Sequence, residues 1–210
     1  MRIVDFLNCK IDVSKKVFQP RIETEFWVKK AIEDIKNLKL KIKNLRILDI
    51  FAGSGCIGIA ALKNIKNCWV DFVDIDDKAI SQIKINLKLN RISKNKYKIY
   101  KSNLFEKLKN KKYDIIFANP PYVALERISE VDKEVLEKEP KIALFAGRDG
   151  MVLIEKFFKK VKSHLKASGT FYLEFDPLQK EKIKEIFEKG GFKFSFQKDQ
   201  FGKYRWLKIC

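Results

Sequence analysis

Short apolar runs alternate with longer amphipathic segments along most of the chain. The short runs predict strands, because a strand needs only four to eight residues; they lie at residues 46–50, 69–74, 97–101 and 113–118. The longer segments predict helices, and they lie at residues 56–65, 77–89, 151–165 and 177–189. The run at 113–118 is mostly apolar, which is typical of a strand buried in a parallel sheet.

The C-terminal part of the chain continues this alternation and then changes. A strand is predicted at 170–175, and Gly190 and Gly191 stop the helix that follows it. Two further strands, 192–198 and 204–209, are separated by a short connection and predict a hairpin. The pattern therefore predicts an α/β fold, a doubly wound sheet that is mostly parallel with one antiparallel strand in a C-terminal hairpin. It resembles the Rossmann-like, seven-stranded methyltransferase fold.

Upstream of the sheet, residues 23–40 carry apolar side chains at helical spacing and predict an amphipathic helix. We divide the chain into an N-terminal extension and helix, residues 1–40, and one α/β domain, residues 41–210. No run of 18 apolar residues occurs, and lysines interrupt the N-terminal segment. These features predict a cytoplasmic protein with no membrane span and no signal peptide.

A glycine-rich loop follows the first strand of the predicted sheet. Gly53, Gly55 and Gly58 satisfy the pattern G-x-G-x-x-G, which permits a tight turn and a close approach of a ligand to the backbone. The pattern alone also fits a nicotinamide cofactor. Asp49, four residues before Gly53, favours S-adenosylmethionine, because a carboxylate attracts the positive methionine end of that cofactor and repels a pyrophosphate.

Asp74 stands at the end of the second strand, where ligands of such sheets bind. Its carboxylate can accept hydrogen bonds from both ribose hydroxyls of the cofactor. The alternative role is the N-cap of the next helix, since Asp76 and Asp77 stand close by.

The tetrapeptide Asn119-Pro120-Pro121-Tyr122 follows the buried strand at 113–118. A nitrogen in a carboxamide or an aromatic amine is planar and a poor nucleophile. The Asn119 side-chain oxygen and the Pro120 carbonyl can each accept one of its N–H bonds, and the prolines stiffen the loop in advance. Tyr122 offers a flat apolar wall. These residues predict transfer of a methyl group to a planar nitrogen, whereas the alternative is a proline-rich turn that closes a strand.

The glycine loop, the tetrapeptide and two other stretches resemble the release-factor glutamine methyltransferases, which methylate the Gly-Gly-Gln loop of peptide-chain release factors. The other stretches are residues 18–25, Phe-Gln-Pro-Arg-Ile-Glu-Thr-Glu, and residues 138–147, which include Glu139. The resemblance runs from Phe18 to the C-terminus. It implies S-adenosylmethionine as methyl donor, a glutamine amide nitrogen as acceptor, a release factor as partner, and no metal.

Together these arguments give two sets of site residues. The expected cofactor contacts are Asp49, Phe51, Ala52, Gly53, Ser54, Gly55, Asp74, Asn103, Leu104 and Asn119. The expected substrate contacts are Asn119, Pro120, Pro121, Tyr122, Glu23 and Glu139, with Asn119, Pro120 and Tyr122 as the catalytic group. Leu104 could instead be a core residue, and Glu23 could be a first-turn acid favoured by the helix dipole.

Three features depart from the family pattern. Only 17 residues precede Phe18, so the family's helical N-terminal domain is expected to be lacking. Ile22 replaces a proline. Asn103 replaces an aspartate, although its side-chain oxygen can still accept from the adenine amine.

The formal net charge of +18 keeps an alternative function open. Such an excess attracts phosphate backbones, so the alternative is a nucleic-acid methyltransferase that acts on an exocyclic amino nitrogen of adenine or guanine. However, 38 of the 45 basic residues are Lys, which equally fits the composition of an AT-rich genome. The fold also leaves little chain for a target-recognition domain. A non-catalytic binding module is disfavoured by the intact tetrapeptide.

The cysteines and the single histidine give no metal ligand set. Cys9, Cys56, Cys68 and Cys210 form no C-x-x-C pair. We expect mostly buried thiols, a surface or packing role for His164 and no dedicated general base.

Overall fold

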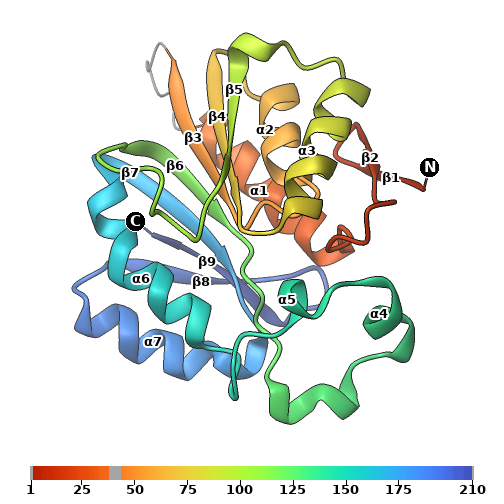
Figure 1. Cartoon of the computed structure of the whole chain (residues 1–210). Helices are drawn as coiled ribbons and strands as arrows, with labels where there is room; N and C mark the ends of the chain where they lie inside the picture. Colours follow the sequence, from red (N-terminus) through yellow and green to blue (C-terminus); the bar gives the residue numbers. More distant parts are fainter. Residues whose placement is uncertain (1, 38–43, 210) are drawn as a thin grey trace.

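The computed structural model describes residues 2–37 and 44–209 and shows a seven-stranded sheet between two layers of helices (Figure 1). The strands of this sheet are β3 (Leu45–Ile50), β4 (Cys68–Asp74), β5 (Tyr97–Lys101), β6 (Tyr113–Ala118), β7 (Leu165–Glu174), β8 (Phe194–Lys198) and β9 (Tyr204–Ile209). Their order is β5-β4-β3-β6-β7-β9-β8, and β9 is antiparallel to both of its neighbours. The predicted α/β fold and the C-terminal hairpin are confirmed, and β5 is an edge strand of the sheet.

The helices cover both faces of the sheet because the strands are apolar on both sides. Along β3, Ile47 packs in the core on the face covered by the N-terminal helices of the chain. Its neighbour Leu48 packs in the core on the opposite face, which the C-terminal helices cover. Successive strand side chains point to opposite faces, so one strand serves two cores. The helices on these cores are α2 (Cys56–Asn64) and α3 (Asp77–Leu89) on one face, and α6 (Val152–His164) and α7 (Lys180–Lys189) on the other. All four agree with the predicted helices, the last being preceded by a 3-10 turn at Pro177–Gln179.

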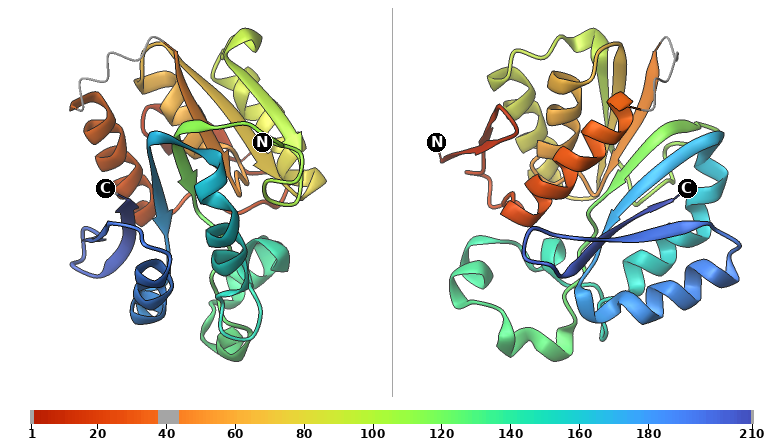
Figure 2. Two further views of the ribbon diagram at one scale, coloured as in Figure 1. Left: turned by 90° about the vertical axis from the view of Figure 1, so that its left-hand side faces the viewer. Right: turned by 180° about the vertical axis from the view of Figure 1, so that it is seen from behind.

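Helix α1 (Ile22–Asn37) packs on the sheet through Trp27, whose side chain is fully buried. The indole ring lies 6.1 Å from the ring of Phe117 and 6.3 Å from that of Trp206. Figure 2 shows this helix from behind, lying across the strands. The predicted helix at 23–40 is confirmed as far as Asn37. Its last residues, and the expected boundary between residues 40 and 41, lie outside the described residues.

An N-terminal hairpin, β1 (Ile3–Phe6) and β2 (Cys9–Asp12), was not predicted. The free edge of β2 pairs with side-chain amides on α3 and on its C-cap residue, Asn90, rather than with another strand. Asn90 exchanges two hydrogen bonds with the backbone of Lys10, at 3.1 and 2.7 Å, and Asn86 exchanges two with the backbone of Asp12, at 2.8 and 3.0 Å. Gln82 accepts one from the backbone of Lys15 at 2.9 Å.

We call these three side chains, Gln82, Asn86 and Asn90, the amide row. They stand four residues apart and therefore share one face of α3. Asn86 also donates to the carbonyl of Ser54 at 2.9 Å. The amide row thus ties the N-terminal hairpin to the glycine loop.

The connection between β6 and α6 contains a 3-10 helix (Leu125–Glu130) and the short helices α4 (Lys133–Lys138) and α5 (Lys141–Leu144), none of which was predicted. A parallel bridge between Val123 and Phe145 closes this segment on itself. None of the described helices is both long and apolar enough to cross a membrane.

Buried thiols are confirmed for Cys9, Cys56 and Cys68, whereas Cys210 lies outside the described residues. Burial raises the pKa of Cys9 and of Cys68 to about 11, so both thiols stay protonated at neutral pH.

Candidate active site

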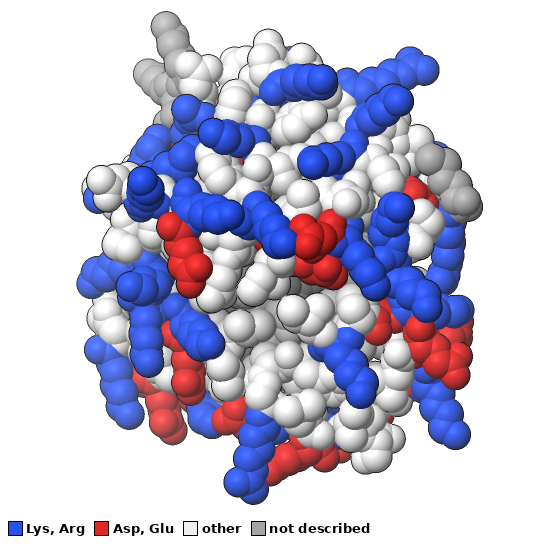
Figure 3. All heavy atoms as spheres, viewed as in Figure 1, with Lys and Arg blue, Asp and Glu red and all other residues white. Residues whose placement is uncertain are grey.

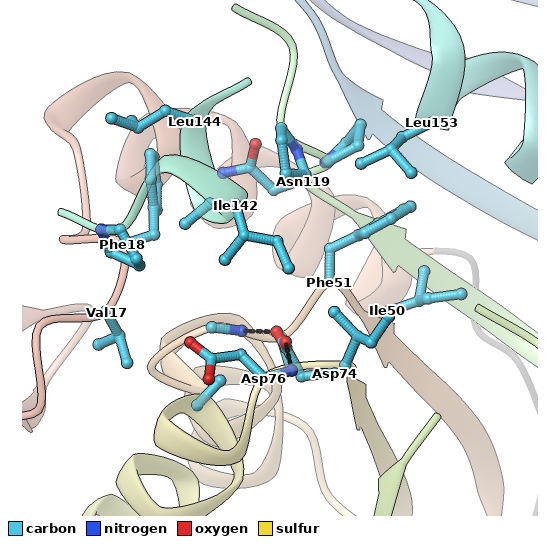
Figure 4. A pocket seen from close by; sticks show the side chains of 18 of the residues that line it. Val17, Phe18, Ile50, Phe51, Asp74, Asp76, Asn119, Ile142, Leu144 and Leu153 are labelled. Carbon is cyan, nitrogen blue, oxygen red and sulfur yellow. Dashed lines mark hydrogen bonds between the residues drawn. The ribbon is translucent and has the colours of Figure 1, made fainter. Parts of the chain in front are cut away.

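A cavity of about 580 Å³ opens at the carboxyl ends of the parallel strands. Phe51 directly follows β3, Asp74 ends β4 and Asn119 directly follows β6, and all three line the cavity. Figure 4 shows Asp74 and Asn119 on opposite sides of this space. Its volume is in the range of about 300–1,000 Å³ that holds small-molecule ligands. In the space-filling view, basic side chains are spread over the surface around a central hollow (Figure 3).

The backbone of the glycine loop is bent sharply at the edge of the cavity. Gly53 and Gly55 have φ values of 53° and 78°, in the left-handed region that glycine adopts without a steric cost. Phe51 has φ 63° and Leu104 has φ 49°, and both are bulky residues that line the cavity. Such conformations are costly and are concentrated at functional sites. Of the nine described non-glycine residues with positive φ, these two line the cavity and the others lie outside it.

Gly58, the third glycine of the motif, serves packing rather than ligand contact. A Cβ atom at this position would lie 2.3 Å from Cε1 of Phe72 and 2.9 Å from Oδ2 of Asp49. The N–H of Gly58 donates to the same Asp49 oxygen at 2.8 Å. Only glycine allows α2 to approach the sheet this closely.

Asp49 is buried, and its carboxylate is only half satisfied. Its Oδ1 atom has no hydrogen-bond partner among the described residues, and only 1% of the residue is exposed. Burial raises the pKa of Asp49 well above its usual value, and the negative charge of Asp74 adds to the effect. A buried, unpaired carboxylate is unfavourable unless a positive group approaches it. Asp49 therefore fits a cationic ligand, although neither it nor Gly55 is among the residues that line the cavity.

Asp74 holds the glycine loop while it faces the cavity. Its Oδ2 accepts from the N–H of Gly53 at 2.8 Å, and its Oδ1 accepts from the N–H of Asp76 at 2.9 Å (Figure 4). A carboxylate has about four acceptor positions, so two remain for a ligand. The N-cap of α3 is Asp76, which accepts from the N–H of Lys78. The alternative role of Asp74 as the helix cap is therefore wrong.

Asn103 and Leu104 line the cavity on the side of β5, and their contact with an adenine stays a prediction. The side-chain amide of Asn103 donates to Glu106 at 2.9 Å, which leaves its oxygen free to accept. His164 is buried and stacks on the ring of Phe105 at 4.5 Å, so its packing role is confirmed. Within residues 2–37 and 44–209, no group of three or more His, Cys, Asp or Glu could hold a metal ion.

The tetrapeptide forms the opposite wall, and all of its four residues line the cavity. The carbonyl of Tyr122 accepts from Nε2 of Gln179 at 3.0 Å, and its hydroxyl donates to Oε1 of Glu174 at 3.0 Å. Gly150 packs against the same carbonyl, since a Cβ there would lie 2.1 Å from it. The loop is therefore fixed by its neighbours as well as by its prolines.

Glu174, at the end of β7, was not predicted as a site residue. It is 1% exposed and accepts hydrogen bonds from Thr24 at 2.8 Å and Trp27 at 2.6 Å, in addition to that from Tyr122. Burial raises its pKa, and these hydrogen bonds oppose the rise. The signal in the sequence was a lone carboxylate inside the apolar run Phe-Tyr-Leu-Glu-Phe, where a charge needs a special reason.

The two predicted glutamate contacts do not line the cavity. Glu139 is buried and forms an ion pair with Arg21, which does line it and lies 5.1 Å from the ring centre of Phe18. Glu23 is half-buried on the first turn of α1. Glu139 thus joins the β6–α6 connection to the N-terminal wall of the cavity. Substrate contact by Glu23 and Glu139 stays a prediction.

The fold and the arrangement of this cavity define a methyltransferase of the Rossmann-like class. Residues 35–190 match the family described as methyltransferase small domain. The release factor glutamine methyltransferase of Flavobacterium psychrophilum is 36% identical over 97% of this chain and 71% of its own length. The enzyme of the same name from Streptococcus pneumoniae is 35% identical over 98% of this chain and 71% of its own length.

A solved structure, the ribosomal protein L11 methylase of Lactobacillus delbrueckii subsp. bulgaricus, superposes with a TM-score of 0.65 at 22% identity, covering 94% of this chain and 82% of that one. At this identity the likeness shows the fold alone. The chain belongs to the release factor glutamine methyltransferase family, within the methyltransferase small domain family.

Proposed function

We propose that this enzyme transfers a methyl group from S-adenosylmethionine to the side-chain amide nitrogen of a glutamine in the Gly-Gly-Gln loop of a peptide-chain release factor. The observation that carries the proposal is the placement of Asn119 across the cavity from Asp74, with Pro120, Pro121 and Tyr122 beside it. The names of its relatives support the same substrate.

The residues on the β3–β5 side fit the cofactor. Asp74 has two free acceptor positions for the ribose hydroxyls. Asp49 supplies an unpaired carboxyl oxygen behind the loop, and a nearby positive group would favour its charged form. The backbone of residues 51–55 allows close approach, and Asn103 and Leu104 would contact the adenine. When bound, S-adenosylmethionine supplies an electrophilic methyl group on a positively charged sulfur.

The tetrapeptide would orient the substrate amide. The planar NH2 group of the substrate glutamine would donate one hydrogen bond to Oδ1 of Asn119 and one to the carbonyl of Pro120. These acceptors would favour positive charge on the nitrogen as it bonds to the methyl carbon while the methyl–sulfur bond breaks and S-adenosylhomocysteine leaves. The nitrogen would then release one proton to water. The hydroxyl of Tyr122 is held by Glu174, so its ring can serve as a rigid wall for the planar group.

The test is an incubation of the protein with labelled S-adenosylmethionine and, separately, a release factor, the same factor with the loop glutamine changed to alanine, and total RNA. We expect label only in the unaltered release factor, and fragmentation mass spectrometry should place one methyl group on the glutamine side chain. Label in RNA and never in the release factor would refute the proposal.

Asn119→Ala tests the catalytic assignment in the same assay. We expect kcat to fall by roughly a hundredfold or more, because an orienting and charge-stabilising acceptor is lost. The dissociation constant of the cofactor should change little, which calorimetry can measure. An equal loss of turnover and cofactor affinity would contradict this role of Asn119.

A further inference from the structure

A chain of hydrogen bonds runs from the buried Glu174 to the tetrapeptide. Oε2 of Glu174 accepts from the indole N–H of Trp27 at 2.6 Å and from the hydroxyl of Thr24 at 2.8 Å. Oγ1 of Thr24 in turn lies 3.4 Å from Nδ2 of Asn119. These hydrogen bonds connect three elements that are distant in sequence: α1, β7 and the loop after β6.

The direction of each hydrogen bond follows from the chemistry of its partners. An ionised carboxylate only accepts, and an indole N–H only donates. The hydroxyl of Thr24 has a single hydrogen, which it gives to Glu174, so its oxygen can only accept from Asn119. The NH2 group of Asn119 must therefore face Thr24. Its carbonyl oxygen, which accepts no hydrogen bond from the described residues, is left to face the substrate.

The charge of Glu174 has support from its surroundings. Burial raises the pKa of this carboxyl, and its hydrogen bonds oppose the rise, as does the positive charge of Arg205. The third donor, the hydroxyl of Tyr122, occupies the other oxygen. Thr24 is itself 1% exposed, so water does not compete for its hydroxyl.

We propose that Thr24 and Glu174 are positioning residues that fix which way round the Asn119 amide stands, and so select a substrate group that donates N–H. An amide flips by exchanging oxygen and nitrogen with almost no change in shape, so packing alone does not choose between the two orientations. With the amide reversed, NH2 would meet the NH2 of the substrate. The inference rests on the proposed function for its catalytic consequence, but the orientation of Asn119 can be tested without substrate.

Thr24→Val and Thr24→Ser form the matched pair for the test. Valine keeps the shape of threonine and removes the hydroxyl, whereas serine keeps the hydroxyl. In the release-factor assay we expect Thr24→Val to lower kcat about 10- to 100-fold, as for the loss of one orienting interaction, and Thr24→Ser to stay within about threefold of the unaltered enzyme. Cofactor affinity and melting temperature, measured on both variants, should show that each is folded and binds the methyl donor.

The second readout is the side-chain NH2 signal of Asn119 in ¹⁵N NMR spectra of the protein without substrate, assigned by its disappearance in Asn119→Ala. We expect it to shift upfield in Thr24→Val and to keep its position in Thr24→Ser. An unshifted signal in Thr24→Val, or equal turnover in the valine and serine variants, would overturn the inference. If the unaltered enzyme failed to methylate a release factor, the proposed function would be wrong, while the NMR comparison would still decide the orientation.

Discussion

Asp74→Asn removes the charge of the carboxylate with almost no change in its size. In the folded protein both of its oxygens accept backbone N–H bonds, one from Gly53 and one from Asp76. Asparagine has one oxygen, so one of these N–H groups would face an NH2 group. Losing that hydrogen bond costs about 1–3 kcal/mol of loop stability, because a partly buried donor is left without an acceptor.

The loss of binding free energy for the cofactor is of similar size. The oxygen that remains can accept from one ribose hydroxyl only, and without the charge. Hydrogen bonds to charged groups contribute about 1.5–3 kcal/mol, which corresponds to an increase in Kd of about 10- to 100-fold. The change should appear in Kd more than in kcat at saturating cofactor, since Asp74 lies across the cavity from Asn119.

The assay is calorimetric titration of S-adenosylmethionine into the variant at constant pH. Asp77→Asn is the matched control, because the same chemical change is made three residues away at an exposed position that pairs with Lys101 outside the cavity. The control should bind like the unaltered protein. If Asp74→Asn bound the cofactor equally well while the protein remained folded, the ribose assignment would be wrong.

Three further predictions concern stability and its dependence on pH. Gly58→Ala should lower the free energy of unfolding by about 1–3 kcal/mol in urea titrations, because the new methyl group overlaps the buried ring of Phe72. Asn86→Leu should lower it by about 3 kcal/mol or more, since buried backbone groups of Asp12 lose their partners. Burial raises the pKa of Asp49, so the native state binds its proton more tightly than the unfolded chain, and stability should fall as pH rises above about 4, the ordinary pKa of an aspartate. Asp49→Asn should flatten that decline without cofactor, and an equally steep decline would contradict the assignment.

The sequence predicted the sheet well because the elements of its core depend on local apolar patterns. The run at Tyr113–Ala118 is buried at every position, as its composition indicates. The helix Asp77–Leu89 has the predicted bounds, since Asp76 gives a recognisable start. The predicted sites that follow strand ends also lie together, because parallel strands end at the same edge.

The remaining features depend on contacts between distant residues and leave weak local signals. On sequence alone, the amide row of α3 has the composition of a solvent-exposed helix face, yet Asn86 is fully buried against the N-terminal hairpin. Thr24 lies within the family-like stretch at residues 18–25, but only the fold shows that its hydroxyl links Glu174 to Asn119. The buried ion pair between Glu139 and Arg21 likewise has no local signal in the sequence, and substrate contact by Glu139 stays a prediction.

The amide row can pair with β2 because the axial spacing of its side chains along the helix nearly matches the spacing of alternate residues along the strand. Four residues of helix rise about 6 Å, and two residues of strand advance about 6.6 Å, so a helix can mimic the edge of a sheet for a few steps only. Asn90 and Asn86 meet residues two apart, Lys10 and Asp12, whereas Gln82 meets Lys15 after the strand has ended. The amide row contacts Lys10 only through its peptide group, so the side chain at that position can vary, whereas the buried carboxylate of Asp12 also accepts from Gln82 at 3.3 Å and from Ser14 at 2.8 Å. In a longer strand the peptide groups would no longer lie opposite the amides of the helix.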